Sequence, residues 1–254
     1  MSHLSDVHIP HRLGIILVGA GSGERLGAGI PKALVQLAGK TLLERCIETS
    51  LSAADTGHLV VVAPAAHAAE ALQAVEKVTE RSALTWTTSV VDGGAERHIS
   101  VENGLAVMPE WVDVVLVHDV ARPLTPISVF HDVATAVRER KVGVVPVLPL
   151  TDTIKRVDNR GSVLETVNRD ELVAAQTPQG FLREDLAAAY EHVAEAMTDD
   201  ASVAKAAGQE VTTVGGSALA HKITTAADLR LLEWMLNNDY GAGSTHTRSK
   251  VAEA

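Results

Sequence analysis

A glycine-rich segment near the N-terminus carries the residues best placed to do chemistry. Residues 19–23, Gly-Ala-Gly-Ser-Gly, follow the apolar run 13–18, which predicts a strand. Glycines leave a turn without side chains, so its backbone N–H groups can approach a phosphate closely. Arg25 and Lys32 follow, seven residues apart. The combination predicts a nucleoside triphosphate held on backbone amides, with two cations that stabilise charge as a phosphate bond breaks.

Three other interpretations of this loop compete with that one. A Walker A loop requires Lys-Ser or Lys-Thr directly after its last glycine, and Glu24-Arg25 stands there, so that class is excluded. A dinucleotide-binding turn needs an acid at the end of the second strand, but the next strand candidate, residues 59–63, ends at Pro64. The third interpretation is a glycine-rich strand-to-helix turn that binds no ligand, and the loop by itself does not exclude it.

Composition limits the class of protein. The 254 residues suit one α/β domain, and the 46% hydrophobic content supports a sizeable core. The longest apolar runs are far too short to span a membrane, and residues 1–10 lack an apolar signal region, which predicts a cytoplasmic protein. The net charge of −10 argues against general nucleic-acid binding but permits a local anion site. The single Cys46 excludes an internal disulfide and a cysteine-built zinc site, and we expect it in the core.

Strand and helix patterns alternate along the chain. Apolar, β-rich runs predict strands at 13–18, 59–63, 86–91, 112–117, 143–148 and 211–214. Capping signals predict helices that begin at Thr41, at Ser100 and at Thr125, the last covering 126–140, and helices over 183–197, 199–207 and 225–237. The alternation predicts an α/β fold with a mostly parallel sheet, helices on both faces and ligands at the carboxyl ends of the strands. We expect a disordered tail over 238–254.

One stretch breaks the alternation. Residues 151–157 and 162–167 flank the turn sequence Asp-Asn-Arg-Gly at 158–161, which predicts a hairpin. It carries too few apolar residues to form its own core, and a two-stranded ribbon is marginal in water unless it packs on something. Its own domain or a second copy of the chain could supply that surface.

A carboxylate ends one of the predicted strands. His118-Asp119 follows the apolar residues 114–117, so Asp119 would lie at the ligand-bearing edge of the sheet. Mg²⁺ is commonly bound by one or two carboxylates together with phosphate oxygens, and Asp119 could serve in this way. The alternative is that Asp119 only caps the following turn. We interpret His118 as a packing histidine, since no second histidine stands at ligand spacing.

Further polar segments lie between the predicted elements. Gly93-Gly94 would open the backbone to a flat ligand, and the Ser100 hydroxyl can bond a base or simply cap a helix. Residues 176–181 are interpreted as a turn rich in hydrogen-bond donors, and 198–200 as a helix cap. Lys222 precedes a predicted helix N-terminus, where its charge opposes the helix dipole, and a bound phosphate would resolve this conflict.

Read in order, these segments resemble the 2-C-methyl-D-erythritol 4-phosphate cytidylyltransferase family of the non-mevalonate isoprenoid pathway. The resemblance covers about residues 13–236 and implies a Rossmann-like domain over 12–237, a homodimer, and a protruding β-arm at 151–167. The segments that carry it are the glycine-rich loop with Arg25 and Pro31-Lys32, Gly93 to Ser100, His118 to Pro123, Asp152 to Lys155, Gln176 to Gln179, Thr198 to Asp200, and Lys222 to Thr224.

The resemblance implies that CMP is transferred from CTP to 2-C-methyl-D-erythritol 4-phosphate with release of pyrophosphate, assisted by Mg²⁺ or another divalent cation. Arg25 and Lys32 would stabilise the transition state, and Lys222 and Arg169 would position the acceptor. The implied CTP site consists of Ala20, Gly21, Ser22, Gly23, Gly94, Ser100 and Asp119, of which Asp119 would also bind the metal. The implied acceptor site adds Arg122, Thr153, Thr177 and Thr198, partly across the dimer.

Two other functions stay open. A cytidylyltransferase for another polyol phosphate, such as ribitol 5-phosphate, is poorly discriminated because both acceptors are polyol phosphates. A non-catalytic nucleotide-binding regulatory subunit is opposed by the presence of Arg25, Lys32, Asp119 and Lys222. Residues 219–221 contain no carboxylate, so the second metal-binding acid frequent in wider nucleotidyltransferases is absent from that position.

Overall fold

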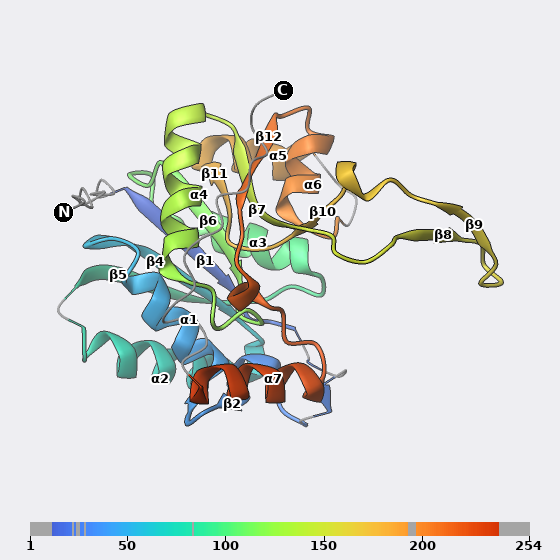
Figure 1. Cartoon of the computed structure of the whole chain (residues 1–254). Helices are drawn as coiled ribbons and strands as arrows, with labels where there is room; N and C mark the ends of the chain where they lie inside the picture. Colours follow the sequence, from blue (N-terminus) through green and yellow to red (C-terminus); the bar gives the residue numbers. More distant parts are fainter. Residues whose placement is uncertain are drawn as a thin grey trace, which may run out of the picture.

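The computed structural model describes residues 12–21, 23, 26–27, 29–82, 84–192 and 197–238. A twisted sheet forms its centre, helices cover both faces, and a two-stranded arm projects from one side (Figure 1). The predictions for Ser22, Arg25 and the tail beyond Asn238 lie outside the described residues.

The central sheet has eight strands, in the order β10-β7-β11-β6-β1-β4-β5, with β12 beside β7. The pairs β1–β4, β1–β6, β4–β5 and β7–β12 are parallel, whereas β10 and β11 run antiparallel to their neighbours. The predicted mostly parallel α/β sheet is therefore confirmed. The strands are β1 (Leu13–Val18), β4 (Thr56–Ala63), β5 (Thr85–Asp92), β6 (Val114–Asp119), β7 (Gly143–Pro149), β10 (Val173–Ala175), β11 (Gln179–Leu182) and β12 (Val211–Gly215).

The prediction of a turn over 176–181 is wrong for its second half, because Gln179–Leu182 forms β11 between β6 and β7. This segment is short and contains glutamine and glycine, so its composition does not favour a strand. Its backbone partners come from strands on both sides, which is a tertiary effect. Gly180 suits the position because a Cβ there would lie 2.5 Å from a Val133 methyl group.

Alternating residues of β1 supply two separate cores. Ile15 and Leu17 face one layer of helices, whereas Ile16 faces the other, as the two-residue period of a strand requires. The first layer contains α1, α2, α4 and α7, and the buried Cys46 of α1 lies in it as expected. The second contains α3, α5 and α6. The helices are α1 (Leu42–Leu51), α2 (Ala68–Thr79), α3 (Arg97–Ala106), α4 (Ile127–Arg140), α5 (Arg183–His192), α6 (Asp200–Ala206) and α7 (Ala226–Asn237).

The helix starts follow local capping chemistry in most cases. Thr41 and Glu44 form the predicted capping box of α1, and Thr225 and Asp228 form another at α7. Helix α4 begins one residue later than predicted, with Pro126 at its N-cap. The prediction that Ser100 caps α3 is wrong. That helix already begins at Arg97, and Ser100 lies inside it.

The predicted hairpin is confirmed as the projecting arm. Strands β8 (Lys155–Val157) and β9 (Val163–Thr166) pair only with each other and stand away from the central sheet (Figure 1). Val163 and Leu164 are each 61% exposed, so the arm presents apolar side chains that the described part of this chain does not cover. A smaller ribbon, β2 (Gln36–Leu37) with β3 (Lys40–Thr41), lies near the glycine-rich loop in the sequence.

Candidate active site

The register of the parallel strands brings the sequence motifs together at one sheet edge. Val18, the last residue of β1, pairs with Asp119, the last residue of β6. On the other side, the Gly19 N–H donates to the Val62 carbonyl at 2.8 Å, and the Gly93 N–H donates to the Ala63 carbonyl at 2.8 Å. The glycine-rich loop, the 93–94 loop and Asp119 therefore share the carboxyl edge, where open α/β sheets bind ligands.

A pocket with a volume of about 720 Å³ opens at this edge. Most of the described residues predicted to bind CTP or to act in catalysis line it, namely Ala20, Gly21, Gly23, Lys32, Gly94, Ser100, Asp119 and Lys222. Arg97, to which the sequence had assigned no role, lines it too.

The glycines of the pocket meet two different needs. A Cβ on Gly93 would lie 2.2 Å from the Ala20 Cβ, so this glycine lets two loops approach each other. A Cβ on Gly21 would meet nothing within 4 Å, so protein packing does not require a glycine there. Gly23 has a φ of +71°, a conformation that favours glycine. The open space at Gly21 is consistent with a loop that leaves room for a ligand.

Ser100 organises the 93–94 loop. Its hydroxyl accepts a hydrogen bond from the Gly94 N–H at 3.1 Å and donates to the Glu96 carbonyl at 3.2 Å. Only 1% of the residue is exposed. The side chain thus fixes the loop from inside α3 rather than capping the helix.

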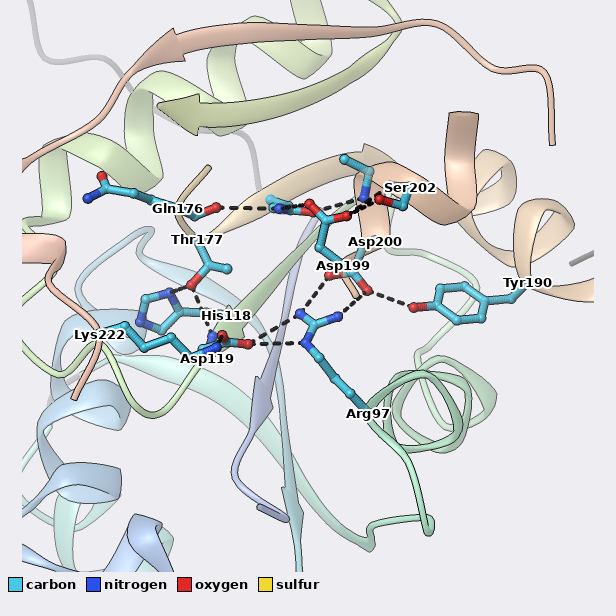
Figure 2. A network of polar contacts seen from close by, with 12 residues as sticks. Arg97, His118, Asp119, Gln176, Thr177, Tyr190, Asp199, Asp200, Ser202 and Lys222 are labelled. Carbon is cyan, nitrogen blue, oxygen red and sulfur yellow. Dashed lines mark hydrogen bonds and ion pairs between the residues drawn. The ribbon is translucent and has the colours of Figure 1, made fainter. Parts of the chain in front are cut away.

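Asp119 is the centre of a buried ion network (Figure 2). Its Oδ2 accepts from the Lys222 Nζ at 2.7 Å, and its Oδ1 accepts from the Nε and Nη2 of Arg97 at 3.3 and 3.2 Å. Burial alone would raise the pKa of the Asp119 carboxyl, but Arg97 and Lys222 outweigh it and hold the pKa well below its usual value. Asp119 is therefore an anion at any physiological pH. Asp119 is the counter-charge of Lys222. A bound phosphate is therefore not needed to explain a lysine before the N-terminus of α7.

Arg97 continues the network to α6. Its Nη1 and Nη2 donate to the two oxygens of Asp200 at 3.1 and 2.8 Å, and the Tyr190 hydroxyl donates to Asp200 Oδ1 at 2.7 Å (Figure 2). Burial alone would lower the pKa of Arg97, but Asp200 and Asp119 outweigh it and raise the pKa above its usual value. The sequence interpretation took 198–200 as a helix cap and gave an acceptor-site role to Thr198 alone, so it assigned no role to Asp200. Asp199 is indeed the cap of α6, and Asp200, the next residue, is completely buried. Asp200 follows a capping aspartate directly, so the sequence offers no signal that separates its buried ion-pair role from a capping role.

Thr177 lies behind the pocket rather than in it. Its hydroxyl accepts from the Asp119 N–H at 3.1 Å and lies 3.0 Å from His118 Nδ1. His118 is buried against Phe130, with ring centroids 4.9 Å apart, which confirms a packing histidine. Burial lowers the pKa of His118 to about 4, so the ring is neutral. Thr177 and His118 thus hold the end of β6 in place.

Lys32 and Lys222 approach the pocket from segments far apart in the sequence. The Lys32 Nζ donates to the Ile223 carbonyl at 2.9 Å. The Ile223 N–H in turn donates to the Ala121 carbonyl at 2.8 Å, directly after the strand that carries Asp119. The segment that contains Lys222 is therefore tied both to β6 and to the glycine-rich side of the pocket.

The other residues predicted for the acceptor site do not line this pocket. Arg122 donates to the carbonyls of Ala220 and Ala175, at 2.6 and 3.3 Å, so it braces the segment before Lys222. Thr153, Arg169 and Thr198 are exposed. Arg169 lies in the short helix η4 (Arg169–Glu171) at the base of the arm and donates to the Thr151 carbonyl. Within one chain, these residues and the pocket are not brought together.

Over the part of the chain that the structure describes, two carboxylates line the pocket, the buried Asp119 and the more exposed Glu96. Among the described residues, no group of three or more histidine, cysteine, aspartate or glutamate side chains could hold a metal ion. Asp119 accepts one hydrogen bond at Oδ2, from Lys222, and an oxygen of this kind has a further lone pair for a cation. The residues therefore fit Mg²⁺ that arrives with a triphosphate, but not a metal held by the protein alone.

Over the described ranges, none of the helices combines the length and the apolar character needed to cross a membrane.

The α/β sheet and a strand-edge pocket that combines a glycine-rich loop with Lys32, Lys222 and Asp119 are the arrangement of a nucleotidyltransferase of the α/β class. A family model described as 2-C-methyl-D-erythritol 4-phosphate cytidylyltransferase matches residues 13–238, and the chain belongs to that family. Enzymes of this family transfer CMP from CTP to 2-C-methyl-D-erythritol 4-phosphate in isoprenoid biosynthesis.

Individual relatives agree with this assignment. A protein named 2-C-methyl-D-erythritol 4-phosphate cytidylyltransferase from Saccharopolyspora erythraea is 48% identical over 221 residues, covering 85% of this chain and 96% of that protein. A bifunctional enzyme IspD/IspF of Clavibacter michiganensis subsp. michiganensis is 52% identical over 93% of this chain, which spans only 57% of that enzyme. The crystal structure of the cytidylyltransferase from Thermus thermophilus superimposes with a TM-score of 0.69 at 30% identity, covering 87% of this chain and 98% of that one.

Proposed function

We propose that this chain catalyses the transfer of CMP from CTP to 2-C-methyl-D-erythritol 4-phosphate in the pocket at the carboxyl edge of the sheet, with residues 12–237 acting as one catalytic domain. One observation carries the proposal: the glycine-rich loop, Lys32, Asp119 and Lys222 converge on a single pocket in a member of this family. No similar observation favours ribitol 5-phosphate as the acceptor or a non-catalytic role.

The reaction requires positioning and charge stabilisation rather than a general base. The nucleophile is a phosphate oxygen of the acceptor, which is already anionic. It forms a bond to the α-phosphorus of CTP, and the bond from that phosphorus to the bridging oxygen breaks, so that pyrophosphate leaves with its electron pair. Lys32 and Arg25 stabilise the charge that develops, while backbone amides of residues 20–23 hold the phosphates.

The nucleoside end of CTP lies toward the 93–94 loop in this proposal. Gly94 contacts the cytosine, Ser100 acts by fixing the loop that carries Gly94, and Asp119 contacts the ribose. Asp119, together with the triphosphate, would hold a divalent cation, Mg²⁺ by preference, and that cation would supply neutralisation of the phosphate charge.

The acceptor site is completed by a second copy of the chain. Lys222 lines the pocket and Arg122 braces the segment before it, but Arg169 and Thr153 lie on or beside the arm. The exposed apolar side chains of the arm, Val163 and Leu164, support its burial against a partner in a homodimer. Thr198 is a weaker candidate for the same site, and Thr177 acts on it only by holding the end of β6 in place. Because the reaction uses CTP, which cells keep in the cytoplasm, cytoplasmic residence is part of the proposal.

The acceptor is tested by direct turnover. With CTP and Mg²⁺, we expect pyrophosphate release with 2-C-methyl-D-erythritol 4-phosphate, and much slower release with ribitol 5-phosphate, measured on the same preparation. Faster release with ribitol 5-phosphate would reassign the acceptor. Tight CTP binding without pyrophosphate release with either compound would instead support the regulatory alternative.

A mixing experiment tests the shared site. If the arm of one subunit completes the pocket of the other, Arg169→Ala and Lys32→Ala chains are each inactive alone, but a mixed dimer contains one site with both residues intact. We expect random mixing to restore about a quarter of the wild-type activity, since about half of the dimers are mixed and each has one intact site. Each variant mixed with itself is the control. Proven subunit exchange with no recovery would show that Arg169 acts within its own chain.

A further inference from the structure

Arg97 is divided between two carboxylates in a way that favours one oxygen of Asp119 over the other. Its Nε and Nη2 both donate to Oδ1 of Asp119, while its Nη1 and Nη2 donate to the two oxygens of Asp200 (Figure 2). Oδ2 of Asp119 bonds Lys222. Arginine prefers to bind a carboxylate through two parallel hydrogen bonds, one to each oxygen. Here it makes that paired contact with Asp200 instead of Asp119.

Asp200 is firmly held. Its carboxylate accepts twice from Arg97 and once from Tyr190, and it is completely buried. It is the first residue of α6, whose start is fixed by Gln179 of β11. The Gln179 side chain donates to Asp199 at 2.8 Å and accepts from the Ala201 N–H at 2.9 Å. The position of the carboxylate is thus set by the sheet itself.

The network is poorly explained by stability alone. Burying an ion pair costs desolvation energy that the mutual attraction roughly repays, so packed apolar residues would often serve stability equally well. A charged arrangement that reaches from the pocket to α6 is better explained by the geometry that it imposes on Asp119.

We propose that Asp200 and Tyr190 are positioning residues for CTP binding, which hold the Arg97 guanidinium so that it takes only Oδ1 of Asp119. Oδ2, which accepts from Lys222, then keeps a further lone pair for the nucleotide. This inference rests on the proposed function of the pocket. Without the Asp200 charge, the guanidinium turns to bind both oxygens of Asp119. Arg97 then competes with CTP for the carboxylate that should receive it.

The test measures CTP binding by calorimetry with Mg²⁺ and without an acceptor. Asp200→Asn keeps the shape of the side chain but removes its charge, and we expect the Kd for CTP to rise on the order of tenfold or more. Tyr190→Phe removes one hydrogen bond to Asp200 while keeping the packing, so a rise of several-fold is expected. The KM for the acceptor at saturating CTP should stay unchanged in both variants. Asp113→Asn is the matched control, because Asp113 pairs with Arg138 at 3.5 Å outside the pocket lining.

A double-mutant cycle separates positioning from a structural role. If Asp200 acts through Arg97, Asp200→Asn should change the Kd for CTP little further in an Arg97→Lys background, since lysine cannot bridge the two carboxylates. A merely structural contribution of Asp200 would add to the effect of Arg97→Lys. Thermal unfolding of each variant checks that the fold persists, and Tyr190→Phe decides the question if Asp200→Asn does not fold.

Additive effects in the cycle, or a Kd for CTP that is unchanged in Tyr190→Phe and in folded Asp200→Asn, would overturn the inference. A wild-type chain that binds CTP but transfers CMP to no polyol phosphate would refute the proposed function instead. The binding comparison would still stand in that case.

Discussion

Replacing Lys32 with alanine is expected to lower kcat by about two orders of magnitude or more, the usual scale for removing a preorganised charge stabiliser. Lys32 lies in the short helix η2 (Lys32–Leu34) at the pocket wall, where its ammonium group bonds the Ile223 carbonyl at 2.9 Å. Its charge can therefore act on the phosphates from a position that the fold fixes.

Steady-state kinetics with CTP and 2-C-methyl-D-erythritol 4-phosphate measure this effect. Lys40→Ala is the matched control, because the partly exposed Lys40 pairs with Glu48 near the surface and such pairs contribute little. Thermal unfolding should show that Lys32→Ala remains folded. A folded Lys32→Ala enzyme with near-normal kcat would remove Lys32 from the catalytic machinery. Arg25→Ala is expected to behave like Lys32→Ala.

Replacing Asp119 is expected to affect both activity and stability. Asp119→Asn should reduce kcat/KM for CTP about a hundredfold, because the neutral amide cannot serve as the anion that faces the nucleotide and its metal. Asp119→Ala also leaves Arg97 and Lys222 without this counter-charge. Breaking a buried pair in this way costs on the order of 3–5 kcal/mol of unfolding free energy. Lys222 is partly exposed, so the lower end of that range is expected.

The stability effect depends on pH with a definite sign. The folded-state pKa of Asp119 is depressed, so its stabilising contribution is present above the unfolded value of about 3.9 and is lost as pH falls toward the folded value. Urea unfolding should therefore show the largest difference between wild type and Asp119→Ala at neutral pH and a smaller one in acid. An unfolding free energy in Asp119→Ala equal to wild type at pH 7 would contradict the proposed network. Unchanged kinetics in Asp119→Asn would exclude Asp119 from the CTP site.

Much of the fold could be predicted because its signals are local. The six long strand runs, the capping boxes at Thr41 and Thr225, and the hairpin turn at 158–161 depend on neighbouring residues, and all appear in the structure. The convergence of the glycine-rich loop and Asp119 followed from topology, because parallel strands end at one edge.

The local signals were insufficient at three places. Strand β11 forms because β6 and β7 bond its backbone from both sides, not because Gln179–Leu182 favours a strand. Serine often caps helices, but the Ser100 hydroxyl instead accepts a hydrogen bond from the Gly94 N–H of the 93–94 loop. Lys222 opposes a helix dipole in the sequence, yet its ammonium group lies on Asp119, 103 residues away along the chain.

By itself, the sequence determined the α/β class, the family resemblance, the loop that approaches phosphate and half of the residues that line the pocket, because periodicity, turn chemistry and motif order depend on neighbouring residues. Only the tertiary structure decided how the charges are paired. Arg97 and Asp200 stand 103 residues apart in the sequence, and both are residue types that usually lie on the surface. Once they are buried, each needs a partner, because an unpaired buried charge is too costly. The partners that satisfy buried charges come from whichever elements the fold packs together, and that packing is not visible in the order of the residues.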